Sequence, residues 1–531
     1  MSEPQTPASV PTAVTADAVP TTLTGELPDG LMAAFTGYER ALAANDLAAL
    51  DAYFAPGEHT LRGDAAGLLV GHDAISGFRG ARSGTVARGI RSVHVRVIGP
   101  RHALIVSVNA PDAGGAGLVT QLWSLADTGA WQVAAAQVAA PPAALNRAVW
   151  RVVGSPLVAA PDNDAALPLA GQTVAVKDLY DIAGFAVGAG NPEYLRLATP
   201  ATGTAPAVSA LLDAGASITG IAQTDEFAYS IAGDNEHYGT PPNVRVPGGL
   251  PGGSSSGPAA AVALGQASIG LATDTAGSIR VPASYQGLWG LRSSHGAVDR
   301  TGLLPLAPSF DTVGWLTRTP GVLRAAAAAS LTGSPVAAPT RFAVSTALIF
   351  AADDAVQGAF VDGVDRLTRA GLLPAPDLVD VGDLAEALAI FRTVQAAEAW
   401  RANGDWVTAH PGALGAAVAG RFTAAATVTA AAEADARTAL AAARARLDAV
   451  LDGRILLLPS ASSTAPPRGA NAAAIDATRT ATLSMTCLAG IGGYPALSVP
   501  LLEVDGAPLG LCLVGPRGSD LALIDLGATL A

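Results

Sequence analysis

A single lysine, Lys177, stands among 30 arginines in this sequence, and it closes the apolar run Thr173–Lys177. Arginine replaces lysine wherever only a surface positive charge is needed, but arginine does not deprotonate in proteins. A lysine at the end of a buried strand is desolvated, which favours the neutral amine and prepares it to act as a base. Lys177 is therefore the first candidate for a catalytic residue.

Two segments rich in glycine and serine could supply its partner. Residues 252–257 read Gly-Gly-Ser-Ser-Ser-Gly and precede a predicted helix, whereas residues 273–280 read Thr-Asp-Thr-Ala-Gly-Ser-Ile-Arg and follow a predicted strand. A phosphate-binding loop would need a lysine within the glycine-rich segment. The lysine lies 254 − 177 = 77 residues upstream of Ser254, so phosphate binding of that kind is excluded.

A second interpretation is the nucleophile elbow of an α/β-hydrolase, because residues 253–257 fit the pattern G-x-S-x-G with Ser255 at its centre. That elbow needs a strand directly before it, and residues 246–252 contain too much proline and glycine for a central strand. The base would be His295 or His410. This alternative stays open, although the sequence around it is unfavourable.

The third interpretation pairs the serines with Lys177. A serine hydroxyl becomes a good nucleophile when a neighbouring base takes its proton, and a Ser-Lys pair is a known form of that arrangement. Successive backbone N–H groups in the turn at residues 275–277 could form an oxyanion hole. Asp178 and Asp181 lie close to the lysine in sequence, and either would favour the ammonium form if it faced the amine.

The segments that position these residues follow an α/β pattern from residue 169 to residue 531, which we interpret as one large domain. A helix is predicted over residues 258–264, another from a cap at Thr204 to Leu212, and alanine-rich helices over residues 354–451. The predicted strands cover residues 173–177, 217–222, 268–273, 455–458, 497–501 and 509–514.

The chain before residue 169 has a different pattern. Residues 1–24 are predicted to be a flexible tail, residues 25–140 a small α+β domain, and residues 141–168 a linker. In the small domain, residues 31–54 have helical spacing that Asn45 and Asp46 interrupt. Short extended runs follow at residues 93–97, 104–108, 118–125 and 131–138.

Composition limits the partners. The net charge is −13 and there is no basic tract, so neither nucleic acid nor an anionic membrane is an expected partner. The least polar stretch, residues 258–272, is too short to span a bilayer. No targeting segment is legible, and a cytoplasmic location is expected. Two cysteines and seven histidines without a paired spacing predict neither a disulfide framework nor a metal site, and no cofactor is expected.

These motifs resemble the amidase signature family: a Val-Lys-Asp strand end, the Gly-Gly-Ser-Ser-Ser-Gly loop, and a second serine 278 − 254 = 24 residues later. The resemblance implies a large mixed β-sheet covered by helices, and amide hydrolysis through an acyl-enzyme. It implies that Ser278 is the nucleophile and that Ser254, after a cis peptide bond from Gly253, passes its proton to Lys177. The implied oxyanion hole consists of the backbone N–H groups of Thr275, Ala276, Gly277 and Ser278.

The same resemblance implies that Ser255, Asp274 and Arg280 support the loops by hydrogen bonding. Residues 225–230, 237–241, 292–296 and 309–314 are similar to short plant-type amidases that hydrolyse indole-3-acetamide, which implies a small primary amide as substrate. Tyr229 and Tyr238 are interpreted as substrate-pocket residues. Ala276 replaces a usual glycine and is tolerable there only with a negative φ.

The small domain resembles the AtzH-like members of the NTF2-like superfamily, through residues 57–75 and the hairpin that carries Trp123 and Trp131. That resemblance implies an α+β cone. A carboxylate pocket in it could be lined by Arg62, His72, Arg79 and Arg82. The alternatives are a scaffold or a homodimer contact, a second site for urea derivatives, or a sensor of an anionic ligand fused to an inactive hydrolase.

Overall fold

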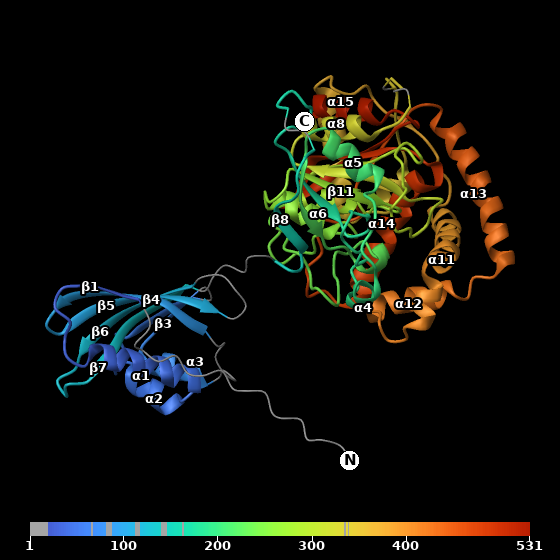
Figure 1. The fold of residues 1–531 in the computed structure, drawn as a ribbon. Coiled ribbons are helices and arrows are strands. Elements are labelled where there is room, and N and C mark those ends of the chain that lie inside the picture. The colour runs from blue at the N-terminus through green and yellow to red at the C-terminus, as the bar shows by residue number, and fades with distance from the viewer. Residues whose placement is uncertain are drawn as a thin grey trace, which may run out of the picture. The chain divides into compact units, whose positions relative to one another are not determined.

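The computed structural model describes residues 20–64, 67–80, 88–111, 117–139, 146–161, 164–333, 336–337 and 339–531. The chain divides into two compact units, residues 1–144 and 145–531. Figure 1 shows that each unit has its own sheet and helices. The expected pocket residue Arg82 lies outside the described residues.

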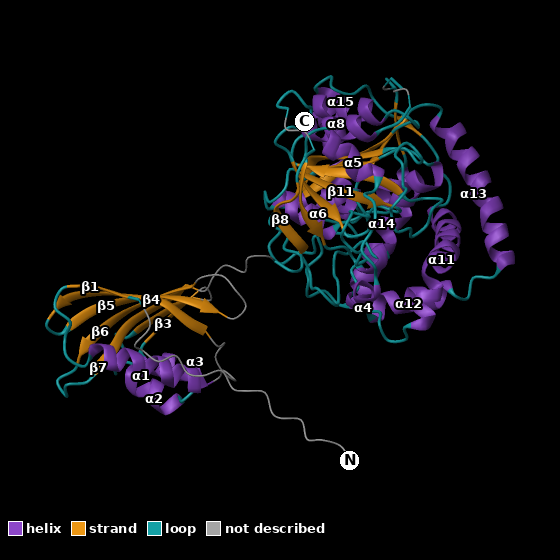
Figure 2. Cartoon of the chain, in the orientation of Figure 1, coloured by secondary structure: helices purple, strands orange, loops and turns teal. Residues whose placement is uncertain are grey.

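The first unit is a seven-stranded sheet with helices on one face (Figure 2). Asn45 adopts a left-handed conformation that ends the first helix, and the Asp46 side chain caps the second by accepting the Ala49 N–H. The predicted helix break and the four predicted strands are confirmed. The elements are β1 (Thr21–Thr24), α1 (Leu31–Ala44), α2 (Leu47–Tyr53), β2 (Leu61–Asp64), β3 (Gly67–Val70), α3 (His72–Gly80), β4 (Arg88–Gly99), β5 (His102–Pro111), β6 (Gly117–Leu125) and β7 (Trp131–Ala139).

The second unit contains an eleven-stranded mixed sheet, which confirms the expected fold class. The strands run in the spatial order β15-β14-β16-β18-β17-β12-β13-β11-β9-β10-β8. Their bounds are β8 (Trp150–Val158), β9 (Thr173–Lys177), β10 (Ser217–Ala222), β11 (Ile269–Asp274), β12 (Trp289–Arg292), β13 (Thr312–Thr317), β14 (Phe342–Val344), β15 (Asp377–Leu378), β16 (Ile455–Pro459), β17 (Ala496–Val504) and β18 (Ala507–Val514).

Helices cover both faces of this sheet. Consecutive strand residues point to opposite faces, and Ala272 accordingly packs with α6 and α7 whereas Leu271 packs in the larger core that includes α8. The helices are α4 (Pro192–Leu197), α5 (Pro206–Asp213), a 3-10 turn at Glu226–Ala228, α6 (Ser256–Ala263), α7 (Arg280–Gln286), α8 (Pro320–Ser330), α9 (Thr346–Phe350), α10 (Asp354–Arg369), α11 (Leu384–Ala409), α12 (Ala416–Ala425), α13 (Ala430–Leu451), α14 (Ala472–Gly492) and α15 (Asp520–Leu530).

The central strands bring the two motifs together. β9 pairs in parallel with β11, with Val176 opposite Leu271, so the carboxyl ends of both strands lie at the same edge. Lys177 ends β9 and Asp274 ends β11. The lysine and the start of the second serine segment therefore meet although 96 residues separate Lys177 from Thr273 in the chain.

Three expectations at the element boundaries are wrong. The expected linker at 141–168 contains β8, which pairs antiparallel with β10 at the edge of the large sheet. The expected tail at 1–24 contains β1, which pairs in parallel with β4. Thr204 does not cap α5, because Pro206 starts the helix after Ala205 and the Thr204 hydroxyl accepts the Ala183 N–H instead.

Both cysteines, Cys487 and Cys512, are free and fully buried, as their apolar surroundings predict. In the described part of the chain, every helix is too short or too polar to cross a membrane.

Candidate active site

Lys177 lies completely buried at the carboxyl end of β9. Its Nζ lies 2.7 Å from Ser254 Oγ, 3.0 Å from Ser255 Oγ and 2.8 Å from Thr273 Oγ1. Burial lowers the pKa of Lys177 from its ordinary value to about 7, even though three nearby carboxylates oppose that shift. Near neutral pH a substantial fraction of the amine is therefore unprotonated and can accept a proton.

The carboxylates that act on Lys177 are not the ones adjacent to it in sequence. Asp178 forms an ion pair with Arg151 at 3.0 Å and accepts the Gly188 N–H at 2.9 Å. Asp181 lines a separate pocket with Tyr194 and Trp406. The carboxylates that favour the ammonium form of Lys177 are instead Asp225, Asp274 and Asp311, whose negative charges raise its pKa against the effect of burial.

Hydrogen bonds at both ends hold the glycine-serine loop. The peptide bond between Gly253 and Ser254 is cis, as the family resemblance implies. The Gly253 N–H donates to the Ile231 carbonyl at 2.8 Å, and the Ser254 carbonyl accepts the Thr224 hydroxyl at 3.0 Å. The Ser255 N–H donates to the Ser278 carbonyl at 3.3 Å, which joins this loop to the second serine segment.

Asp225 holds the same loop from the other side. It accepts hydrogen bonds from the Gly233 N–H and the Ser256 hydroxyl, each at 2.9 Å. Burial raises the pKa of Asp225 to about 6. A side chain at Gly253 would collide with this carboxylate, so the close approach requires a glycine.

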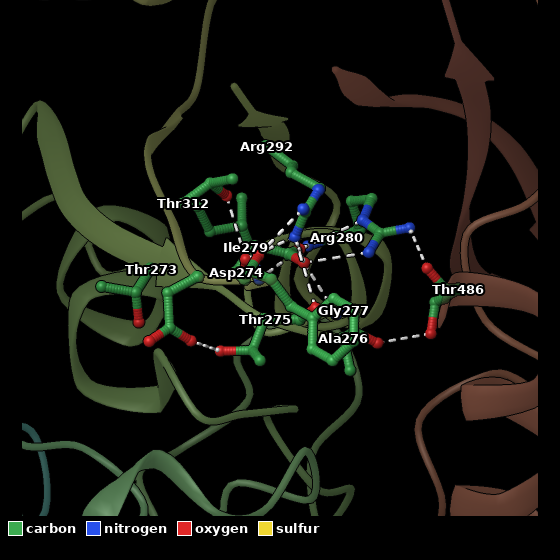
Figure 3. A network of polar contacts seen from close by, with 12 residues as sticks. Thr273, Asp274, Thr275, Ala276, Gly277, Ile279, Arg280, Arg292, Thr312 and Thr486 are labelled. Atoms are coloured by element: carbon green, nitrogen blue, oxygen red, sulfur yellow. Dashed lines mark hydrogen bonds and ion pairs between the residues drawn. The ribbon is translucent and has the colours of Figure 1, made fainter. Parts of the chain in front are cut away.

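The turn after β11 wraps around Asp274 (Figure 3). Its carboxylate accepts the Gly277 N–H at 2.8 Å and the Ile279 N–H at 3.1 Å. Arg280 pairs with both carboxylate oxygens, at 3.1 and 2.9 Å, and Arg292 approaches to 3.1 Å. All three charged side chains are fully buried. Burial alone would raise the pKa of Asp274, but the two guanidinium groups outweigh it and hold that pKa far below its usual range.

The Asp274 contacts correct one expectation. The Gly277 N–H donates to Asp274, so it is already engaged and does not belong to the expected oxyanion hole. The N–H groups of Thr275, Ala276 and Ser278 remain the candidates. Gly277 has a φ of 129°, whereas Ala276 is not among the residues with positive φ, so alanine is tolerated there.

Sequence reasoning missed four residues that fix this turn, namely Asp311, Thr312, Thr486 and Arg292. The Thr275 hydroxyl donates to Asp311 at 2.6 Å, and the Thr312 hydroxyl donates to the Asp274 carbonyl at 2.9 Å. The Thr486 hydroxyl, on α14, donates to the Ala276 carbonyl (Figure 3). Arg292 is the fourth. Its apolar neighbours Leu291 and Trp289 are the sequence signal that this arginine is buried, and a buried arginine needs a buried partner.

The histidines needed for the elbow alternative lie elsewhere. His295 Nε2 hydrogen-bonds with the Pro308 carbonyl at 2.9 Å, and His410 Nδ1 hydrogen-bonds with the Trp406 carbonyl at 2.8 Å. The Ser255 hydroxyl donates to the Thr273 carbonyl at 3.2 Å. Residues 246–252 form turns rather than a strand, so the geometry of an elbow is absent from this described segment.

The two predicted pocket tyrosines are in different places. Tyr229 is buried and lines a pocket of about 340 Å³ together with three arginines. Tyr238 is half-buried, and its N–H donates to the Asn235 side chain at 3.0 Å.

In the first unit, two of the predicted pocket arginines have aromatic partners. Arg79 lies over the Phe54 ring at 4.8 Å and donates to the Tyr38 hydroxyl, and Arg62 lies over the Phe78 ring at 4.4 Å. His72 is half-buried and hydrogen-bonds with the backbone carbonyl of Asp51.

Comparisons with known proteins agree with this geometry. The sequence pattern of the family described as Amidase matches residues 135–524, and the AtzH-like pattern matches residues 25–142. Amidase 1 of Oryza sativa subsp. japonica is 34% identical over 69% of this chain and 91% of its own length. The 2-amino-5-chloromuconic acid deaminase of Comamonas testosteroni is 34% identical over 68% of this chain and 80% of its own length.

A solved structure described as an amidase superposes with a TM-score of 0.62 at 29% identity, covering 72% of this chain and 92% of that one. The chain therefore belongs to the amidase family, a family of hydrolases that act on amide bonds, and it carries an AtzH-like unit ahead of the amidase domain.

Proposed function

We propose that the protein hydrolyses a small carboxylic amide to the acid and ammonia, with Ser278 as nucleophile, Ser254 as proton relay and Lys177 as base. The observation that carries this proposal is the buried Lys177 amine, with a pKa of about 7, within hydrogen-bonding distance of Ser254. A base whose pKa lies near the working pH is partly unprotonated and still binds a proton well.

The contacts of the amine support this assignment of roles. A neutral amine has two N–H groups and one lone pair. Ser255 and Thr273 can accept the two N–H groups, since the Ser255 proton is already donated to the Thr273 carbonyl. The lone pair is then left for the Ser254 proton.

In acylation, Ser254 gives its proton to Lys177 and takes the proton of Ser278 as the Ser278 oxygen attacks the amide carbonyl. The negative charge on the carbonyl oxygen is held by backbone N–H groups of residues 275, 276 and 278. Ser254 then protonates the departing nitrogen, ammonia leaves, and Lys177 returns its proton to Ser254. Water attacks the Ser278 ester by the same relay and releases the acid.

Labelling by a fluorophosphonate, followed by mass spectrometry of the adduct, tests this proposal. We expect one adduct, on Ser278, and ammonia release from indole-3-acetamide or a simple aliphatic amide that the Ser278→Ala variant lacks. An adduct on Ser255 would instead favour the elbow alternative. A folded protein that forms no adduct and releases no ammonia would favour a ligand sensor without activity.

A second candidate function concerns the first unit alone. Three polar residues, Ser107, Asn109 and Gln121, lie on the inward face of β5 and β6 and are at most 2% exposed. Each has a side-chain atom that forms no hydrogen bond with the described part of the chain. Unsatisfied buried polar groups are costly unless a ligand or water pairs with them. We propose a polar ligand site inside this sheet, consistent with the AtzH-like match, and a carboxylated urea is the ligand to test.

Calorimetry on the full-length Ser278→Ala variant separates this function from the first one. Binding of the carboxylated urea that is lost in an additional Gln121→Leu substitution would support it. Binding that survives this substitution would contradict it. The predicted cytoplasmic location and homodimer contact stay predictions.

A further inference from the structure

A cluster of three arginines surrounds Tyr229 in the second unit. The pocket of about 340 Å³ is lined by Arg392 of α11, Arg421 of α12 and Arg479 of α14, and we call it the arginine pocket. Arg392 and Arg421 are 421 − 392 = 29 positions apart in sequence, and Arg421 and Arg479 are 479 − 421 = 58 positions apart. Three separate helices therefore converge to place positive charge in one cavity.

The arginine pocket has too little negative charge of its own. Asp476 is the one carboxylate among the described residues that line it, and its side chain is 69% exposed and 3.5 Å from Arg479. Water around the exposed Asp476 carboxylate screens its charge. The Arg479 side chain is only 15% exposed, and its buried Nε has no hydrogen-bond partner among the described residues.

The other two arginines are held in place by neutral groups. Arg421 donates to the Tyr229 carbonyl at 2.7 Å, and Arg392 donates to the Thr480 hydroxyl at 2.9 Å. Each guanidinium has five N–H donors, so these contacts leave others for a ligand. Burial, and then the like charges of Arg421 and Arg392, lower the pKa of Arg479 to about 10.

Carboxylates near the arginine pocket are mostly committed elsewhere. An adjoining pocket of about 450 Å³ shares Arg421 and Arg479 and is also lined by Glu226, Asp234 and Glu236. Glu226 accepts hydrogen bonds from the Asn191 side chain and the Gly415 N–H, and Glu236 accepts two N–H groups at the start of α12. Asp234 is exposed. Within the described residues, Arg479 forms an ion pair only with the exposed Asp476, and neither Arg392 nor Arg421 forms one.

Two residues that line the adjoining pocket flank a contact with the glycine-serine loop. Ser230 and Ala232 line the adjoining pocket, and Ile231 between them accepts the Gly253 N–H at 2.8 Å. Arg479 and Thr486 lie on the same helix, and Thr486 holds the Ala276 carbonyl. Seven residues of α-helix rise about 10 Å, a distance that a small elongated substrate spans.

We propose that the arginine pocket binds a carboxylate on the acyl part of the substrate, so that the enzyme prefers monoamides of dicarboxylic acids to neutral amides. Guanidinium groups bind carboxylates through paired, charge-assisted hydrogen bonds, and an anion here would relieve the repulsion among three cations. This inference rests on the proposed amidase function and names its substrate class.

Matched amides test the proposal. Ammonia release is measured for succinamate against butyramide and for adipamate against hexanamide. We expect the wild-type kcat/KM to favour at least one carboxylated amide over its neutral partner by about tenfold or more, the value of one hydrogen-bonded charged contact. Arg479→Gln and Arg392→Gln should each reduce that ratio by about tenfold, chiefly through KM.

Arg324→Gln is the matched control. Arg324 is an exposed arginine of α8 that pairs with Asp525, so this substitution should leave the ratio of the two kcat/KM values unchanged. Thermal unfolding shows which variants are folded. If the Arg479 variant is not folded, the variant at the half-buried Arg392 carries the test. Equal wild-type rates on both members of each pair, or an unchanged ratio in both folded variants, would overturn this inference and leave the amidase function standing. Absence of ammonia release from every amide, together with absence of fluorophosphonate labelling, would overturn the proposed function itself.

Discussion

Lys177 Nζ lies 2.7 Å from Ser254 Oγ, and both side chains are fully inaccessible to solvent. Water cannot screen the amine there or act as its proton acceptor. The proton chemistry of the site is thus confined to side chains whose positions are fixed by the loops at 252–257 and 273–280.

Removing the amine should abolish most of the activity. Lys177→Ala is expected to lower kcat/KM by about 100-fold to 10,000-fold, the usual contribution of a general base. Lys177→Arg should fail as well, because a guanidinium does not deprotonate. Ammonia release measures both variants. Activity in either one close to wild type would show that another group serves as the base.

Activity should rise with pH through neutrality. The pKa of Lys177 is about 7, so the neutral, active amine is lost as the pH falls below that value and predominates above it. A plot of log kcat/KM against pH should climb between about pH 6 and pH 8 with an apparent pKa near 7. A flat profile across this window, measured with an uncharged amide, would contradict a lysine base.

Asp274→Asn should strongly destabilise the fold. It leaves the fully buried Arg280 and Arg292 without their carboxylate, and removing one partner of a buried ion pair costs about 3 to 5 kcal/mol. Asp525→Asn removes the partner of Arg324 at the surface, and should cost less than about 1 kcal/mol. Urea unfolding measures the free energy of unfolding of both variants. Equal losses would show that the buried Asp274 pairs stabilise the fold no more than the surface pair does.

Gly253→Ala should impair catalysis more than folding. The added methyl group collides with the Asp225 carboxylate and displaces the loop that carries Ser254. We expect a large drop in kcat with an unfolding midpoint close to that of wild type. Gly321→Ala in α8 is the control, since its methyl group would meet no atom within 4 Å. Wild-type kcat in Gly253→Ala would mean that the loop tolerates this displacement.

Local sequence predicted the strands on either side of the site well. Thr173–Lys177 and Ser217–Ala222 form strands with the predicted bounds because both are short segments rich in apolar and β-branched residues. β8 was missed because residues 150–158 include a glycine and a proline, and their pairing with β10 depends on a partner about 60 residues away. Boundaries set by distant partners are not visible in a local pattern.

Some residues of the candidate site could likewise be predicted from the local sequence, and others could not. Lys177 and the serines could be found from residue type and motif, since the chemistry itself demands those groups. Asp225 and Thr486 could not, because they act by supporting the loops from remote segments, and Thr486 lies 210 residues from its partner Ala276. The Gly277 N–H was misassigned because only the folded turn shows that Asp274 already occupies it.

The scarcity of lysine makes this protein its own conformational reporter. Reagents that acylate side-chain amines find one target in the whole sequence, and in the native fold Lys177 is sealed from solvent. Incorporation of such a reagent at Lys177 therefore measures how often the catalytic loops open, without any introduced probe.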